Sequence, residues 1–247
     1  MIGLDTIGKI IVVTAALLGT LRYGAGLYAW RVAERLEKPA YTIIKRLSGG
    51  VELRQYEPYL IAETTLAEGG FSARDGFRTC AGYIFGKNRP RRGFLASNND
   101  ASSEKMAMTA PVRISGETKS SVSKGENMKM TAPVRITGGI ANQKRTKVSF
   151  VIGSKYSLSS APRPLDKNVK IREVKSHTLA VRTFSGPPPT NERVEEERVK
   201  IEKILAKENV LPKSNSETLV YGYHDPVITP NLLRKNEVGV AVESRSW

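Results

Sequence analysis

The chain has 247 residues, of which 40% are hydrophobic; this is enough to build one sizeable core, and it excludes an intrinsically disordered protein. Lys and Arg number 39 against 24 Asp and Glu, so the formal net charge of +15 favours an acidic partner such as a phospholipid surface, a nucleic acid or a ligand that carries carboxylates. The lone Cys80 excludes an internal disulfide and any metal site built from several cysteines.

Residues 1–38 predict a membrane anchor followed by a short basic segment. An uncharged run covers residues 10–21, and Arg22, Tyr23 and Trp30 follow it, as suits a spanning helix whose end lies at a membrane interface. A cleaved signal peptide is the alternative, but the lone Lys9 makes a poor basic start for one. Because positive charge is heavier after the run than before it, the sequence favours the cytoplasmic side for the following domain.

A single domain is predicted over residues 39–247. Alternating apolar residues and glycine-rich turns predict strands over residues 41–45, 51–56 and 59–66, and then a helix over residues 72–85. Cys80 falls on or beside the apolar face of that helix, so we expect it to be a buried small hydrophobe rather than a reactive thiol.

The densest basic run covers residues 86–93 and ends the helix. Such a run is typical of a solvated loop, and the alternative is a contact with anionic headgroups or ligand carboxylates. Aromatic residues do not alternate with these charges in the way that single-stranded nucleic-acid platforms need. The sequence therefore predicts no nucleic-acid partner.

The phrase Met-x-Met-Thr-Ala-Pro-Val-Arg-Ile occurs twice, at residues 106–114 and 128–136. Proline fixes φ and removes a donor, so each copy predicts a strand that is entered at an edge or a bulge. Two interpretations stay open. The copies pair as a hairpin, or their methionine side chains, which adapt to flat surfaces, line a groove for a large apolar ligand.

Further strands are predicted over residues 146–152, 169–174, 178–184, 218–223 and 237–242, with a second helix over residues 190–207. Thr190 is the expected N-cap of that helix, and Val194, Ile201 and Leu205 form its apolar stripe, while its charges are expected to be solvated pairs. Strands, a helix and strands thus occur twice, which predicts an α+β fold of two similar halves around a largely antiparallel sheet.

Several motifs occur in a fixed order along the domain: Gly76-Phe77, Gly82-Tyr-Ile-Phe-Gly-Lys-Asn88, the repeated Met-x-Met-Thr-Ala-Pro-Val, Lys170-Ile-Arg-Glu-Val174, Val181-Arg-Thr-Phe-Ser-Gly186 and Leu233-Arg-Lys-Asn-Glu-Val238. In these motifs the domain resembles the SOUL haem-binding protein family, in its membrane-anchored bacterial and plastid-like branch. The resemblance implies a distorted, pseudo-symmetric antiparallel β-barrel flanked by two helices, as in SOUL and GyrI-like domains. It also implies reversible binding of haem or another tetrapyrrole in a shallow groove between the first domain helix and the loop before the last strand.

Carried over by position, the resemblance implies a groove lined by Arg74, Phe77, Arg78, Ala81, Gly82 and Tyr83 on the helix, by Tyr223, Pro226 and Pro230 in the loop, and by Met128 and Met130 from the second copy of the repeat. Two interpretations of Arg74 and Arg78 stay open: they pair with the propionates of haem, or they are solvated surface residues. The two methionines reach the groove or belong to the core.

His224 lies in the loop that the family uses, and histidine is a good ligand for haem iron. The resemblance implies haem binding both with and without an axial histidine, so His224 as the metal ligand is one of two readings. His177 is expected to be exposed.

The sequence thus predicts a membrane-tethered protein that binds, buffers or transfers haem without catalysis, since no nucleophile with an adjacent base, carboxylate pair or metal-ligand cluster occurs at a motif. A membrane-bound protein- or lipid-interaction module that uses the same groove is the alternative. A small-molecule sensor like the GyrI-like effector domains is a third reading, but no helix-turn-helix segment accompanies the domain.

Overall fold

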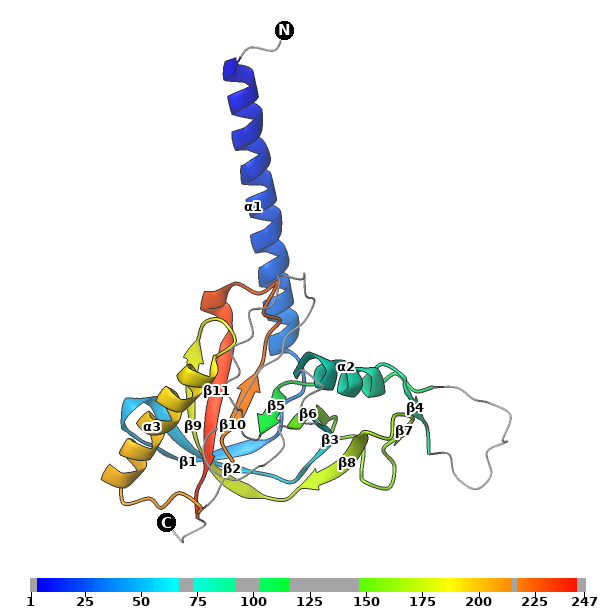
Figure 1. The fold of residues 1–247 in the computed structure, drawn as a ribbon, viewed down its shortest axis with the longest axis vertical. Coiled ribbons are helices and arrows are strands. Elements are labelled where there is room, and N and C mark those ends of the chain that lie inside the picture. Colours follow the sequence, from blue (N-terminus) through cyan, green and yellow to red (C-terminus); the bar gives the residue numbers. More distant parts are fainter. Residues whose placement is uncertain (1–3, 67–72, 92–102, 116–146, 215–216, 244–247) are drawn as a thin grey trace.

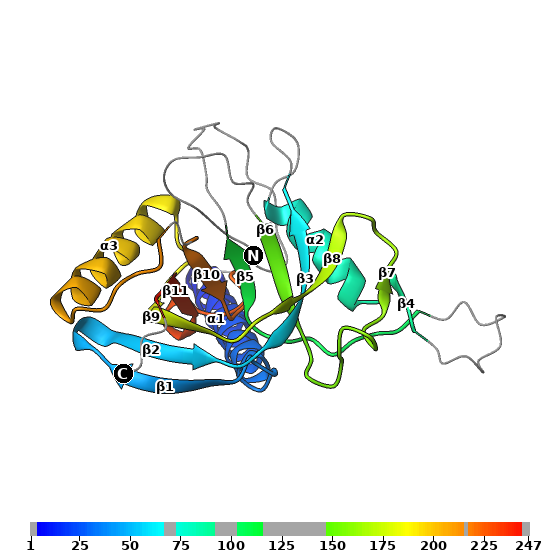
Figure 2. The same cartoon turned by 90° about the horizontal axis from the view of Figure 1, so that it is seen from below.

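A curled antiparallel sheet organises the protein in a computed structural model that describes residues 4–66, 73–91, 103–115, 147–214 and 217–243. Its strands are β1 (Tyr41–Arg46), β2 (Val51–Tyr56), β3 (Tyr59–Thr65), β5 (Val112–Ser115), β6 (Lys147–Ile152), β8 (Val169–Val174), β9 (His177–Ser185), β10 (Leu219–Gly222) and β11 (Lys235–Ala241). They lie in the order β1-β2-β9-β11-β10-β5-β6-β3-β8, and every neighbouring pair is antiparallel (Figures 1 and 2). This half-barrel confirms the α+β fold class predicted from the sequence.

Two helices, α2 (Ala73–Ile84) and α3 (Asn191–Lys207), cover one face of the sheet. One core cluster lies under α2 and contains Phe150 and Ile114, and another lies under α3 and contains Val220. Ile114 and Val220 stand directly opposite each other in the β5–β10 register, so their side chains point to the same face. The helices therefore share a face and sit over different halves of the sheet, as Figure 2 shows.

The helix α3 begins where the sequence predicts, because the Thr190 hydroxyl accepts a hydrogen bond from the Arg193 backbone N–H. Val194, Ile201 and Leu205 are fully buried, as expected. The expectation of only solvated charges on α3 was wrong, because Glu197 is also fully buried. Arg182 on β9, Arg193 and Lys200 pair with its carboxylate, which offsets the cost of burying it.

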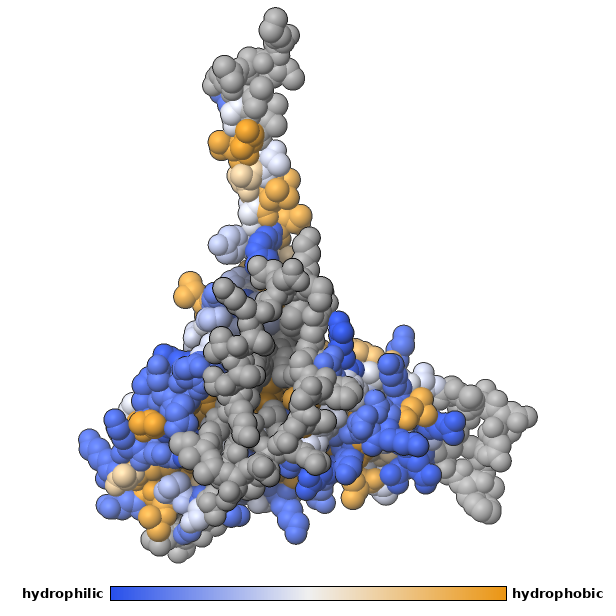
Figure 3. Space-filling view, in the orientation of Figure 1, coloured by the Kyte–Doolittle hydropathy of each residue, from blue (hydrophilic) through white to orange (hydrophobic). Residues whose placement is uncertain are grey.

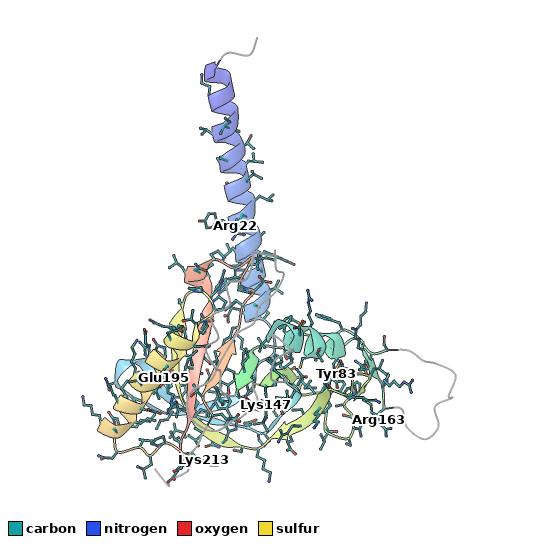
Figure 4. All side chains as sticks on the ribbon, in the orientation of Figure 1. Arg22, Tyr83, Lys147, Arg163, Glu195 and Lys213 are labelled. Carbon is teal, nitrogen blue, oxygen red and sulfur yellow. The ribbon has the colours of Figure 1, made fainter. Side chains whose placement is uncertain are left out.

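The basic run at residues 86–93 is not wholly a solvated loop. Short β4 (Asn88–Arg89) pairs with β7 (Arg163–Pro164), and the buried Asn88 side chain donates hydrogen bonds to the carbonyls of Tyr83 and Glu104. Figure 4 shows Tyr83 and Arg163 in this part of the protein. Local sequence could not give this pairing, because β4 and β7 are far apart in the chain.

The first copy of the repeated phrase forms β5, and Met106 just before it is buried. Strands β6 and β10 pair with β5 along its whole length, so the interpretation that the two copies form a hairpin was wrong for residues 112–115. The second copy, with Met128 and Met130, lies outside the described residues. Cys80 is fully buried and burial raises the pKa of its thiol to about 12, which confirms that it is a core residue.

The N-terminal helix α1 (Leu4–Glu34) projects from the sheet, and its upper part carries exposed apolar side chains (Figures 1 and 3). By length and composition, residues Ile11–Glu34 could cross a membrane, although a signal sequence passes the same test. Only the lower end of α1 contacts the domain. There the buried Gly26 lies against Pro230 and Ile228, close enough that a side chain at this position would clash.

Candidate functional site

The predicted groove residues on α2 mostly face the core. The Phe77 ring packs against Phe150 with a centroid distance of 5.0 Å, and Ala81 and Tyr83 are buried. The Tyr83 hydroxyl donates a 3.0 Å hydrogen bond to the Pro162 carbonyl, and burial raises its pKa. Among the described side chains of this set, Arg78 is the exposed one.

Two further predicted groove residues, Arg74 and Gly82, also lie on α2. Arg74 belongs to the first turn of the helix, but its side chain lies outside the described residues. Gly82 lies beside the aliphatic part of the Lys87 side chain, which a side chain at Gly82 would have to displace slightly. The inner face of α2 is therefore occupied by packing, and its outer face is what remains for a ligand.

The predicted loop residues lie beside the C-terminal end of α1, residues 26–34, which we call the foot of α1. Tyr223 and His224 are buried, Pro226 is half-buried, and Pro230 packs against Gly26 of α1. The structure thus brings these residues together with one another and with the N-terminal helix.

Both ring nitrogens of His224 face the protein. Its Nδ1 accepts a hydrogen bond from the Lys235 backbone N–H at 3.0 Å, so the proton of the neutral ring is on Nε2. That Nε2 lies 3.0 Å from Glu34 Oε1 of α1, at ion-pair distance but without the alignment of a hydrogen bond. Burial lowers the pKa of His224, and the neighbouring Glu34 offsets this only in part. Iron could reach Nε2 only if the foot of α1 moved aside, and ligation by His224 stays a prediction.

A buried polar network that sequence reasoning missed lies next to His224. The fully buried Glu237 of β11 accepts hydrogen bonds from the Tyr223 hydroxyl at 2.6 Å and from Arg54 Nη1 and the Thr183 hydroxyl, each at 3.0 Å. Lys235 Nζ is a further partner at 3.0 Å. Burial alone would raise the pKa of Glu237, but Arg54 and Lys235 hold that pKa below its ordinary value.

A hollow of about 950 Å³ opens at the junction between α1 and the sheet, and we call it the linker pocket. Its walls come from the α1–β1 linker (residues 37–40), the β2–β3 turn with Tyr59 and Leu60, the end of β6 with residues 154–159, and the side chains of Arg91 and Glu173. This volume lies at the upper end of what a small-molecule or cofactor site usually has.

The linker pocket combines flat apolar surface with charges of both signs. Tyr59 and Tyr156 are half-buried, and Leu158 has 49% of its surface exposed. The Tyr156 hydroxyl donates a 2.6 Å hydrogen bond to Glu104, while Lys38 and Arg91 supply positive charge at the rim.

The backbone of the linker is held in place on one side of this hollow. The Glu37 carboxylate accepts a 2.6 Å hydrogen bond from the Ser154 N–H, and the Glu37 carbonyl accepts one from the Ala110 N–H. This pocket has no local signal in the sequence, because it joins the linker to loops that are distant in the chain.

Among the described residues no three His, Cys, Asp or Glu side chains gather as a metal site. Tyr59 and Tyr156 line the linker pocket, and burial raises the pKa of each hydroxyl, whereas Glu237 and His224 are enclosed by the protein and do not line this pocket.

A model of the SOUL heme-binding protein family matches residues 36–241, which is most of the chain. The chain belongs to the SOUL family. The match begins just after α1, so the linker, the linker pocket and the late loop are all part of the SOUL domain. Among curated proteins, none matches this SOUL chain.

Several solved structures are similar to this SOUL protein at low identity. A hydrolase from Listeria innocua is 8% identical with a TM-score of 0.48, over 81% of this chain and 93% of the other. A bacterial transcription regulation protein from Staphylococcus aureus MU50 is 14% identical with a TM-score of 0.32, over 84% of this chain and 100% of the other. At these scores the likeness says nothing about the activity of the SOUL protein.

Proposed function

We propose that this SOUL protein is a membrane-tethered, non-catalytic binder of haem or another tetrapyrrole, and that its ligand lies in the linker pocket. The observation that carries the proposal is the position of this large hollow at the root of α1, within the part of the chain that matches a haem-binding family. On this proposal α1 is the membrane anchor, and the domain holds its ligand close to the membrane.

The chemistry of the pocket fits a flat macrocycle with carboxylate arms. Tyr59, Tyr156 and Leu158 offer apolar and aromatic surface to the ring. Arg91 offers positive charge to a propionate, and contacts between a cation and a carboxylate are among the strong hydrogen bonds. Lys38 also lines the pocket, but its Nζ is paired with Glu34 at 2.7 Å.

Binding by burial of the ring favours exchange over permanent retention. Burying apolar surface contributes about 25 cal/mol per Å², from which the costs of ordering the ligand and of desolvating polar groups are subtracted. The net affinity is moderate unless a protein side chain ligates the iron. A moderate affinity suits a protein that buffers haem or hands it to another acceptor.

The outer face of α2 is the competing location. Arg78 is exposed there, and Arg74, Met128 and Met130 are predicted members whose side chains lie outside the described residues. The two locations can be distinguished by substitution, because Arg91 lines the linker pocket and Arg78 does not.

A haem titration of the full chain in detergent micelles, followed by the Soret absorbance, tests the proposal. Arg91→Ala should raise the Kd several-fold, while the matched Arg78→Ala, which removes another exposed arginine, should leave it unchanged. The reverse pattern would place haem on α2. The absence of any saturable Soret change would overturn haem binding and favour the interaction module.

His224→Ala belongs in the same titration because it addresses the iron. An unchanged Soret position in this variant is expected for haem in the linker pocket, since His224 does not line it. A displaced Soret band would establish His224 as an axial ligand and would move the proposed site to the foot of α1.

A further inference from the structure

The loop before β11 carries an apolar tip that is exposed in the described protein. Leu232 in the short helix η2 (Asn231–Leu233) is 87% exposed, and Val227 and Ile228 are each 39% exposed. Among the exposed large hydrophobic residues in the described part of the chain, Leu232 has the highest value. The short orange-red helix just before β11 in Figure 1 is η2, to the left of α1, and Figure 3 shows a hydrophobic patch there.

The tip is held in its shape and does not depend on a partner for its order. The Asp225 carboxylate accepts hydrogen bonds from the backbone N–H groups of Val227 and Ile228, at 2.7 and 2.9 Å. The Arg234 guanidinium donates a 2.7 Å hydrogen bond to the Thr229 carbonyl. Such local side-chain bonds fix a turn, so the apolar side chains are presented to the outside by the fold.

Contacts with α1 fix the height of the loop along the helix. Arg22 Nη2 donates a 3.2 Å hydrogen bond to the Val227 carbonyl, and one turn later Gly26 packs against Pro230. Figure 4 shows Arg22 where α1 enters the domain. The part of α1 below this level is beside the protein and cannot be surrounded by lipid.

The same height is where a bilayer surface would lie. The part of α1 above this level, Leu4–Leu21, includes the charged Asp5 and Lys9 near its start and the uncharged run of residues 10–21. It extends about 26 Å at 1.5 Å per residue, against the roughly 30 Å thickness of a hydrocarbon core. Arg22 would then lie among the headgroups, as an arginine at the end of a spanning helix does. Val227, Ile228 and Leu232 would lie beside it.

We propose that the loop 225–233 is a second membrane contact, in which Val227, Ile228 and Leu232 enter the lipid interface next to α1. This inference rests on the proposed anchoring by α1, and it goes further by fixing the orientation of the domain on the bilayer. The neighbouring Arg22 is exposed and adds positive charge, which favours a leaflet with anionic lipids.

The test uses full-length protein in vesicles of neutral and anionic phospholipid, with one added cysteine that carries the fluorophore NBD. The position under test is Leu232→Cys, and the matched control is Leu211→Cys, another leucine with 45% exposure. Leu17→Cys reports on α1 itself, and the unchanged chain controls for labelling because Cys80 is fully buried. The quencher is a lipid with a nitroxide near the headgroup end of its acyl chain.

The probe at residue 232 should lose most of its fluorescence to the nitroxide lipid, and the probe at residue 211 should lose almost none. Equal quenching at the two positions overturns the proposal. So does a probe at residue 232 that is shielded from aqueous iodide but untouched by the lipid quencher, because a second protein surface would then cover the tip. Loss of quenching at residue 17 overturns the anchor and the loop contact together, whereas quenching at 17 without quenching at 232 removes the loop contact alone.

Discussion

Glu237→Ala should cost about 3–5 kcal/mol of unfolding free energy, the range for removing one partner from a buried ion pair. The Arg54 side chain has only 4% exposure, and after the substitution Glu52, itself 24% exposed, would be the carboxylate left to it. Tyr223 and Thr183 would lose a hydrogen-bond acceptor in the same place. Since whole domains are stable by only about 5–15 kcal/mol, this substitution would bring the protein near unfolding. Urea unfolding of the full chain in detergent micelles measures the loss.

Matched variants separate the network from a general effect of removing a carboxylate. Glu208→Ala removes the partner of Lys45 at the surface and should change stability by less than about 1 kcal/mol. The double variant Arg54→Met with Glu237→Leu should recover part of the loss, because exchanging a whole buried pair for apolar residues is often tolerated. If Glu237→Ala costs no more than Glu208→Ala, the network does not stabilise the fold as argued.

Three other outcomes are expected from the packing and from the foot of α1. Phe77→Ala should cost about 3–5 kcal/mol of stability, because its ring packs on Phe150, while the control Phe85→Ala, at 57% exposure, should cost much less in the same urea experiment. Burial lowers the pKa of His224 below its value in the unfolded chain. The contribution of neutral His224 to stability is therefore present above about pH 6.5 and is lost as the pH falls through the lowered pKa. His224→Asn should flatten the dependence of Tm on pH between 7 and about 5. A chain that begins at residue 39 should be soluble but have a lower Tm than one that begins at residue 25, because the longer chain keeps the contact of Glu34 with His224. Equal Tm values would show that the foot of α1 adds nothing to the stability of the domain.

The elements that the sequence predicted well are those with local signals. The helix predicted over residues 190–207 is α3 at Asn191–Lys207, because a capping threonine and an apolar stripe lie within the helix itself. The burial of Cys80 followed from the same periodicity on α2. The resemblance to the SOUL family, which depends on motifs in a fixed order, gave the half-barrel.

The site residues were harder, because burial of a charge depends on distant partners. Glu197 was expected on a solvated face, and Arg182, from a strand before α3, is among the partners that allow it to be buried. Val238 in β11 belongs to the core under α3, so its neighbour Glu237 points to the opposite face of the sheet, and its burial depends on partners such as Arg54 of β2. The linker pocket had no such hint, since its walls come together only when the linker, the β2–β3 turn and residues 154–159 are folded.

On the proposed function, the contacts at the foot of α1 decide how a ligand would enter and leave. The end of α1 and the linker contact the domain at three places along the chain: Gly26 packs against Pro230, Glu34 lies at ion-pair distance from His224, and Glu37 accepts a hydrogen bond from Ser154. The domain is therefore not joined to the anchor by a flexible linker. Glu34 lies about 12 Å below Gly26 along the helix at 1.5 Å per residue, and the linker pocket begins directly after it. The pocket would thus open at a fixed, short distance from the lipid. An apolar macrocycle partitions into lipid in preference to water, so this geometry favours exchange of the ligand with the membrane.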